Sequence, residues 1–200
     1  VLLDRHSPLS CVYVYVNFLF LHSFCFLFLF FFFFQAEYGI RYRVASRGLG
    51  DVYKSPMQHG VLRRSFTVFG VRFDVCKFLS VAQKELAVIR WEAVSVDGKT
   101  HQVRIDSIID ADVKNEDSNY EEKFWQVLDK GVSDDRSYIA TQTVANPFGV
   151  EQFIVNAEQT FAGSFKALSG SQTDWQVSNS FQAEVGGTPE TFEKRVIVTT

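Results

Sequence analysis

The chain has 200 residues, of which 46% are hydrophobic and 22% charged, enough for one domain with a sizeable core but too few for a large multidomain enzyme. Its 20 basic and 23 acidic residues give a net charge of −3, which predicts no nucleic-acid partner. Ten of the 21 Phe residues lie between Phe18 and Phe34. The sequence therefore has two unlike parts, residues 1–35 and residues 36–200.

Residues 11–34 form an uncharged apolar run that only Asn17, His22 and Ser23 interrupt. About 20 apolar residues suffice for a helix that spans a bilayer, so one interpretation is a membrane anchor. The run does not resemble a secretory signal, because Arg5 is the only basic residue before it and no small-residue cleavage pattern precedes Ala36.

The residue types of this run share thymine-rich codons, and Gln35 can be encoded by CAG. A pyrimidine tract followed by CAG is typical of the 3′ end of an intron. Our preferred hypothesis is that residues 1–35 are a mistranslated intron. A membrane segment at residues 11–34 is the alternative, and only in that case is a membrane a partner.

Residues 36–200 have the composition of an ordinary globular domain. Cys76 is their only cysteine, so the sequence predicts no disulfide within this part. The chain also contains no N-x-S/T acceptor for glycosylation. Both observations favour a cytoplasmic location.

Two β-hairpins are predicted in the first half of this part. Residues 61–69 and 71–76 alternate between apolar and polar side chains on either side of Gly70. Residues 85–96 are rich in β-branched and aromatic residues, Asp97 and Gly98 supply a turn, and residues 101–109 return. The second hairpin has the stronger signal.

Short strands also dominate the second half. They are predicted at residues 138–144, 152–157, 176–185 and 191–199, separated by Gly or Pro turns. Only residues 120–130 show helical spacing, through Phe124, Val127 and Leu128. The pattern predicts an all-β fold, an antiparallel β-sandwich with one short helix near residues 120–130.

An acidic cluster after residue 109 is the first candidate for a metal site or a carboxylate pair. An EF-hand loop beginning at Asp110 would need an oxygen ligand at its fifth position and Gly at its sixth, where the chain has Lys114 and Asn115. We interpret the cluster as a solvated loop, with a catalytic carboxylate pair as the alternative. Its members are Asp110, Asp112, Asn115, Glu116, Asp117, Glu121 and Glu122.

Other candidates are isolated. His59 and His101 lack metal-ligand spacing, Cys76 has no nearby His, and residues 48–50 are too short for a dinucleotide fingerprint. Several aromatic residues could stack on a sugar, but aromatic residues of a sandwich more often belong to its core. They are Trp91, Trp125, Trp175, Tyr120, Phe124 and Phe148. We therefore predict no catalytic, cofactor-binding or metal-binding residue.

Several segments of the second part carry a family resemblance: residues 60–66, 78–87, 110–125, 143–155 (with Asn146, Pro147 and Phe148) and 193–199. In this order they resemble the N-terminal domain of glycoside hydrolase family 65, which includes maltose phosphorylases and their kojibiose and trehalose relatives. The resemblance covers about residues 57–200.

The resemblance implies a large sandwich of the galactose-mutarotase-like kind, followed in the family by a linker and a helical (α/α)6 barrel. Family members cleave an α-linked glucose disaccharide with inorganic phosphate as co-substrate and invert the anomeric centre, and a Glu in the barrel is the general acid. No residue of the barrel matches this sequence, so no catalytic residue carries over and no cofactor is implied. The implied partners are the barrel, the disaccharide and a second copy in a homodimer.

The sequence departs from the family pattern before residue 57, where the usual glycine-rich opening is not recognisable. An incomplete sandwich, lacking the barrel and inactive by itself, is therefore the expected product. Two alternatives stay open. One is a stand-alone carbohydrate-binding module, anchored to a membrane if residues 11–34 are translated, and the other is an interaction domain without a ligand.

Overall fold

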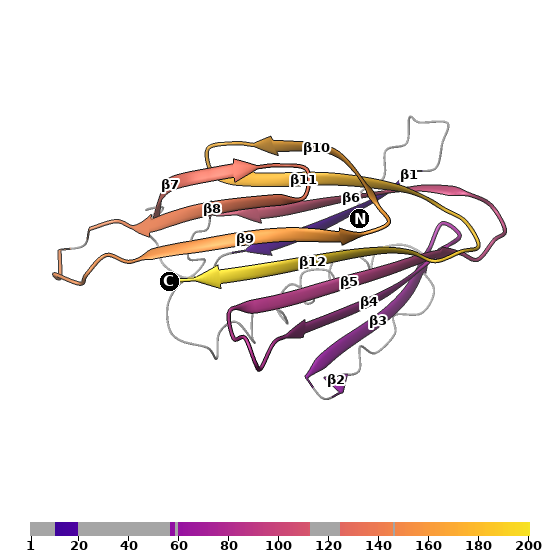
Figure 1. The fold of residues 1–200 in the computed structure, drawn as a ribbon, viewed down its shortest axis with the longest axis horizontal. Coiled ribbons are helices and arrows are strands. Elements are labelled where there is room, and N and C mark those ends of the chain that lie inside the picture. Colours follow the sequence, from indigo (N-terminus) through magenta and orange to yellow (C-terminus); the bar gives the residue numbers. More distant parts are fainter. Residues whose placement is uncertain (1–10, 20–56, 59, 113–124, 146) are drawn as a thin grey trace, which may run out of the picture.

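The computed structural model describes residues 11–19, 57–58, 60–112, 125–145 and 147–200 of the chain, and in these residues all regular structure is β (Figure 1). The strands are β1 (Cys11–Leu19), β2 (Met57–Gln58), β3 (Val61–Val68), β4 (Val71–Leu79), β5 (Leu86–Ser95), β6 (His101–Asp110), β7 (Trp125–Val132), β8 (Arg136–Thr143), β9 (Ile154–Gly163), β10 (Lys166–Gln172), β11 (Gln176–Val185) and β12 (Glu190–Thr199).

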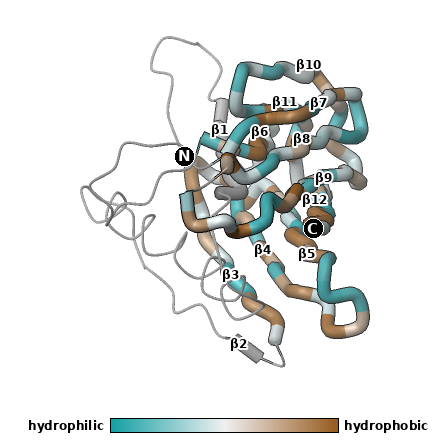
Figure 2. The backbone as a smooth tube through the Cα atoms, turned by 90° about the vertical axis from the view of Figure 1, so that its left-hand side faces the viewer, coloured by the Kyte–Doolittle hydropathy of each residue, from teal (hydrophilic) through white to brown (hydrophobic). Residues whose placement is uncertain are grey.

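The strands form two sheets. The larger has the order β2-β3-β4-β5-β12-β9-β8-β7 and the smaller has the order β1-β6-β11-β10. Every pairing is antiparallel except that of β1 with β6, which is parallel. Hydrophobic and hydrophilic residues alternate along many strands, as expected when one face of each sheet is buried (Figure 2). The predicted all-β sandwich is confirmed.

The first predicted hairpin is confirmed, and the second is wrong. The strands β3 and β4 pair directly across the Phe69-Gly70 turn. The strands β5 and β6 form at the predicted places, but they lie in different sheets, β5 between β4 and β12 and β6 between β1 and β11. The alternation and the turn at Asp97 and Gly98 indicate where the two strands end, but they do not indicate which strands pair with them. In this fold the turn connects the larger sheet to the smaller one.

The predicted helix is also wrong where the structure describes it. Residues Trp125–Val132 form β7, which pairs with β8 and has a register shift between Val127 and Asp129. Val127 and Val132 pack against a buried cluster of the sandwich, so burial against the other sheet outweighs the weak helical spacing. The strand β10, which lies at one edge of the smaller sheet, was not predicted because its seven residues are all exposed and do not alternate in hydrophobicity.

Part of the apolar leader belongs to the smaller sheet. Residues Cys11–Leu19 form β1, in register with residues 102–110 of β6. The rest of the Phe-rich run, residues 20–34, lies outside the described residues. Residues 48–50, which are too short for a dinucleotide fingerprint, also lie outside them. Within the described ranges, no helix is long and apolar enough to cross a membrane.

Two hydrophobic clusters fill the space between the sheets. The larger joins β4, β5 and β12 to β6 and β11 and includes Phe73, Ile105 and Phe192. The smaller joins β6 and β11 to β8 and β9 through Ile109, Ile139 and Val177. The buried polar residues Ser107 of β6 and Gln159 of β9 lie between the two clusters along their strands.

The turn between β3 and β4 contains a strained aromatic residue. Phe69 and Gly70 both have positive φ, 50° and 79°, which is the geometry of a type I′ turn. Asn is favoured at the first position and Phe is not, because a side chain without a local hydrogen bond gains nothing there. Phe69 is 50% exposed, so little packing offsets the strain.

We therefore expect Phe69→Asn to stabilise the domain by about 1 kcal/mol. Urea unfolding followed by Trp fluorescence measures the change. Phe78→Asn is the control, because Phe78 is similarly exposed but lies in β4 and its φ is not positive. A Phe69→Asn variant no more stable than the parent would contradict the strained-turn interpretation.

Candidate functional site

A buried glutamine links the two sheets at the centre of the sandwich. Gln159 of β9 is fully buried, and its Oε1 accepts a hydrogen bond of 2.9 Å from the Ser107 hydroxyl of β6. Its Nε2 donates to the Ser137 hydroxyl of β8 at 2.7 Å. Ser107 and Ser137 are also fully buried. The amide is hydrogen-bonded on both sides, so the group holds the sheets in register.

Three other buried side-chain atoms of the described residues lack hydrogen-bond partners, and one of them is Nε1 of Trp91 in β5. The Nζ atom of Lys194 in β12 and the Oδ1 atom of Asn179 in β11 are buried and make no hydrogen bond. Asn179 does donate from Nδ2 to the Ser133 carbonyl at 2.6 Å. Lys194 is fully buried, and burial lowers its pKa from 10.5 to about 7. Its neutral form is therefore far more accessible near neutral pH than that of an exposed lysine.

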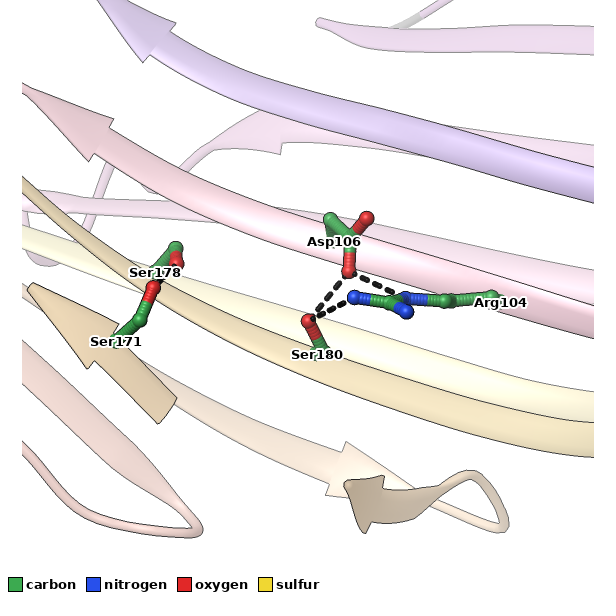
Figure 3. A network of polar contacts seen from close by, with 5 residues as sticks. All are labelled: Arg104, Asp106, Ser171, Ser178 and Ser180. Carbon is green, nitrogen blue, oxygen red and sulfur yellow. Dashed lines mark hydrogen bonds and ion pairs between the residues drawn. The ribbon is translucent and has the colours of Figure 1, made fainter. Parts of the chain in front are cut away.

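On the outer face of the smaller sheet, an ion pair is held by a serine (Figure 3). The Arg104 Nε atom donates to Asp106 Oδ1 at 2.9 Å, and Arg104 Nη2 donates to the Ser180 hydroxyl at 3.0 Å. Ser180 in turn donates to Asp106 Oδ1. Arg104 and Asp106 lie on β6 and Ser180 lies on β11, so this network stabilises the pairing of two strands.

The turn between β5 and β6 is organised by Asp97. Its Oδ1 atom lies 2.8 Å from His101 Nε2 and accepts hydrogen bonds from the Lys99 backbone N–H and the Ser95 hydroxyl, each at 3.0 Å. The His101 contact, followed by the Lys99 N–H, lowers the pKa of Asp97 to about 2. The Ser95 hydroxyl is bonded to the carboxylate and not to the imidazole. This is therefore not the serine–histidine–carboxylate relay of a nucleophilic enzyme.

The acidic cluster is described only at its beginning. Asp110 Oδ1 accepts the backbone N–H of Asp112 at 2.9 Å, and Asp110 Oδ2 accepts Gln176 Nε2 at 2.7 Å, so this carboxylate caps the end of β6. The other five members, between residues 115 and 122, lie outside the described residues. Among the described residues, no group of three or more His, Cys, Asp or Glu could hold a metal ion.

The structure does not gather the aromatic candidates into one platform. Trp91 packs edge-on against Phe66 and Phe73, with ring centroids 6.2 and 6.1 Å apart, at the larger cluster. Trp175 packs against the smaller cluster. Trp125 contacts Phe153, and Phe148 is 87% exposed. Tyr120 and Phe124, like His59, lie outside the described residues, and Cys76 is a free, partly buried thiol of β4.

Neither Lys194 nor Gln159 was among the candidate residues predicted from the sequence. The signal for Lys194 is its position: it alternates with Phe192 and Val196, so period two alone places it on the buried face of β12. Gln159 follows the same rule, two residues after the buried Ala157. A charged or amide side chain at an inward position of a strand is therefore the sequence signal for such a buried polar group.

The comparisons with known proteins assign the chain to a family. The model of "Glycosyl hydrolase family 65, N-terminal domain" matches residues 56–200. The chain belongs to glycosyl hydrolase family 65. Its matched part is the N-terminal domain of that family, as the resemblance in the sequence implies.

The domain is similar to one named protein in sequence and to one solved structure in fold. Maltose phosphorylase of Bacillus subtilis (strain 168) is 37% identical over 149 residues, which are 72% of this chain and 19% of that protein. The structure of a putative kojibiose phosphorylase from human microbiome superposes with a TM-score of 0.58 and 12% identity, over 70% of this chain and 18% of that one. This structure supports the fold. The chain spans about a fifth of the length of either relative.

Proposed function

We propose that this family 65 domain is a non-catalytic part of a disaccharide phosphorylase that cleaves an α-linked glucose disaccharide with inorganic phosphate. The observation that carries the proposal is the match of residues 56–200 to the family's N-terminal domain, together with 37% identity to a maltose phosphorylase. In this proposal the sandwich supports an (α/α)6 catalytic barrel and a homodimer interface. The single free cysteine of residues 36–200 supports a cytoplasmic site of action.

One assay tests both the supporting and the non-catalytic role. Phosphate-dependent release of glucose 1-phosphate from maltose is measured for three samples: the chain alone, the Bacillus subtilis maltose phosphorylase, and a chimera of that enzyme in which residues 56–200 replace the matched segment. We expect no release by the chain and release by the enzyme and the chimera. The same enzyme with its matched segment deleted should be inactive.

Two results would contradict the proposal. Turnover by the chain alone would place catalytic groups within it, and a folded but inactive chimera would show that the domain does not support this class of barrel. Calorimetric titration of the chain with maltose adds a third readout. Saturable binding would favour the carbohydrate-binding module instead.

A further inference from the structure

The strand β12 carries a charge-bearing side chain into the buried interior of the sandwich. Lys194 lies between Phe192 and Val196 on the inner face of β12, and all three residues are fully buried or nearly so. Its cross-strand neighbours are Ile89 of β5 and Phe161 of β9. The residues that flank Lys194 on this face and pair with it across the strands are thus apolar, and its Nζ atom makes no hydrogen bond.

No described carboxylate faces this amine from the strands that pack around it. Glu193 and Arg195, the neighbours of Lys194 in sequence, point to the other face of β12 and pair at 2.7 Å. The nearest charged residue on the inner face of the same sheet is Lys77 of β4, which pairs with Ile89. Its ammonium group would carry the same sign of charge as a protonated Lys194. Other charged residues of the neighbouring strands alternate to the outer faces, among them Arg90 and Glu92 on β5, Glu158 on β9, Arg104 and Asp106 on β6, and Glu184 on β11. The one titratable group on the inner face of β6 is His101, at the start of the strand, and its Nε2 atom lies 2.8 Å from Asp97 Oδ1.

An ammonium group in this position would be a buried charge without a counterion, which proteins avoid. Two responses are open to the molecule: the amine stays neutral, or the space between the sheets admits water. Asn179 Oδ1, also buried and unpartnered between the sheets, is a second group that entering water would satisfy.

We propose that Lys194 is an acid-sensitive switch in the interior of the sandwich, which keeps the two sheets closed while its amine is neutral and loosens them when the amine takes up a proton. Burial lowers the pKa of Lys194 to about 7, against 10.5 for an exposed lysine. The unfolded chain therefore binds the proton more tightly than the folded one. The contribution of Lys194 to the free energy of unfolding is therefore lowest below about pH 7 and rises until about pH 10.5.

The test is urea unfolding of the whole chain between pH 6 and pH 10, compared with Lys194→Met and Lys194→Arg. The folding equilibrium constant of the parent should rise relative to that of Lys194→Met by up to about tenfold per pH unit above pH 7. Lys194→Arg keeps its charge throughout this range, so it should show no such rise. Lys166→Met, at an exposed lysine of β10, is the matched control and should follow the parent.

The loosening itself is measured by hydrogen exchange of β12 and β6 amides at pH 6 and pH 8.5, corrected for the intrinsic rates. Protection should fall at pH 6 in the parent and not in Lys194→Met. Identical pH profiles of the parent and Lys194→Met would overturn the proposal. If Lys194→Met does not fold, NMR titration of the lysine 13Cε resonances of the parent provides the test instead. The proposal fails if every lysine of the parent titrates above pH 9.

Discussion

Replacement of Gly163 by alanine is expected to destabilise the domain by more than about 3 kcal/mol. Gly163 ends β9 with φ of 127°, a region that L side chains rarely adopt. A Cβ atom there would lie 2.2 Å from the Thr191 carbonyl oxygen and 3.1 Å from the Phe192 Cα atom. Because these are backbone atoms of the paired strand β12, neither can move without opening the ladder.

The position matters because the chain changes sheets there. Ser164 follows Gly163, its N–H donates to the Thr191 carbonyl at 2.8 Å, and its hydroxyl accepts the Thr191 N–H at 2.9 Å. The close approach of Gly163 thus allows β9 to end against β12 before β10 begins in the smaller sheet.

Two effects would destabilise Gly163→Ala: the strain of a positive φ and the contact of the added Cβ atom with β12. Urea unfolding of Gly163→Ala and Gly98→Ala separates them. Gly98 also has positive φ, 74°, but a Cβ atom there meets nothing within 4 Å. Its substitution should cost only about 1 kcal/mol of backbone strain. Equal losses in the two variants would show that the contact with β12 is unimportant.

Replacement of Phe192 by alanine is expected to cost about 3–5 kcal/mol. Phe192 is 1% exposed, and its ring lies within 6 Å, between centroids, of three others. Phe161 comes from the same sheet and Phe181 from the opposite one, whereas Phe165 lies in the connection between β9 and β10. Truncation therefore leaves a cavity that both sheets line.

The loss is measured as a decrease in the free energy of unfolding, with Phe192→Leu as an intermediate case. Phe78→Ala is the matched control, because Phe78 lies in the same sheet but is 36% exposed, and its loss should cost less than about 1 kcal/mol. If Phe192→Ala and Phe78→Ala lose the same stability, the aromatic group does not hold the sheets together.

Much of the fold was predictable because a half-buried strand has a local sequence pattern, the alternation of apolar and polar residues. Alternation placed β3, β4, β5, β6, β8, β11 and β12 within a few residues of their bounds, and Gly70 and Asp97-Gly98 marked true turns. The strands β10 and β1 were missed for opposite reasons. The first is exposed at all seven residues and mixes Ala167 and Leu168 with polar residues, whereas the second lies in a continuous apolar run, so neither alternates between polar and apolar side chains.

The polar interior was less accessible to prediction. Period two places Lys194 and Gln159 on inward faces, but it does not show what faces them. Gln159 finds Ser107 and Ser137, 52 and 22 residues away in the sequence, and Lys194 finds no acceptor. Such pairings are set by the stacking of two sheets, which no local pattern encodes.

The sequence by itself determined the β character of the chain, most strand positions and membership of family 65, because each depends on residue order within short segments. Only the tertiary structure decided that β5 and β6 lie in different sheets, that Trp125–Val132 is a strand, and that the Lys194 amine is buried without a partner. The reason is physical: alternation reports that one face of a strand is buried, whereas the choice of partner depends on the packing of distant strands.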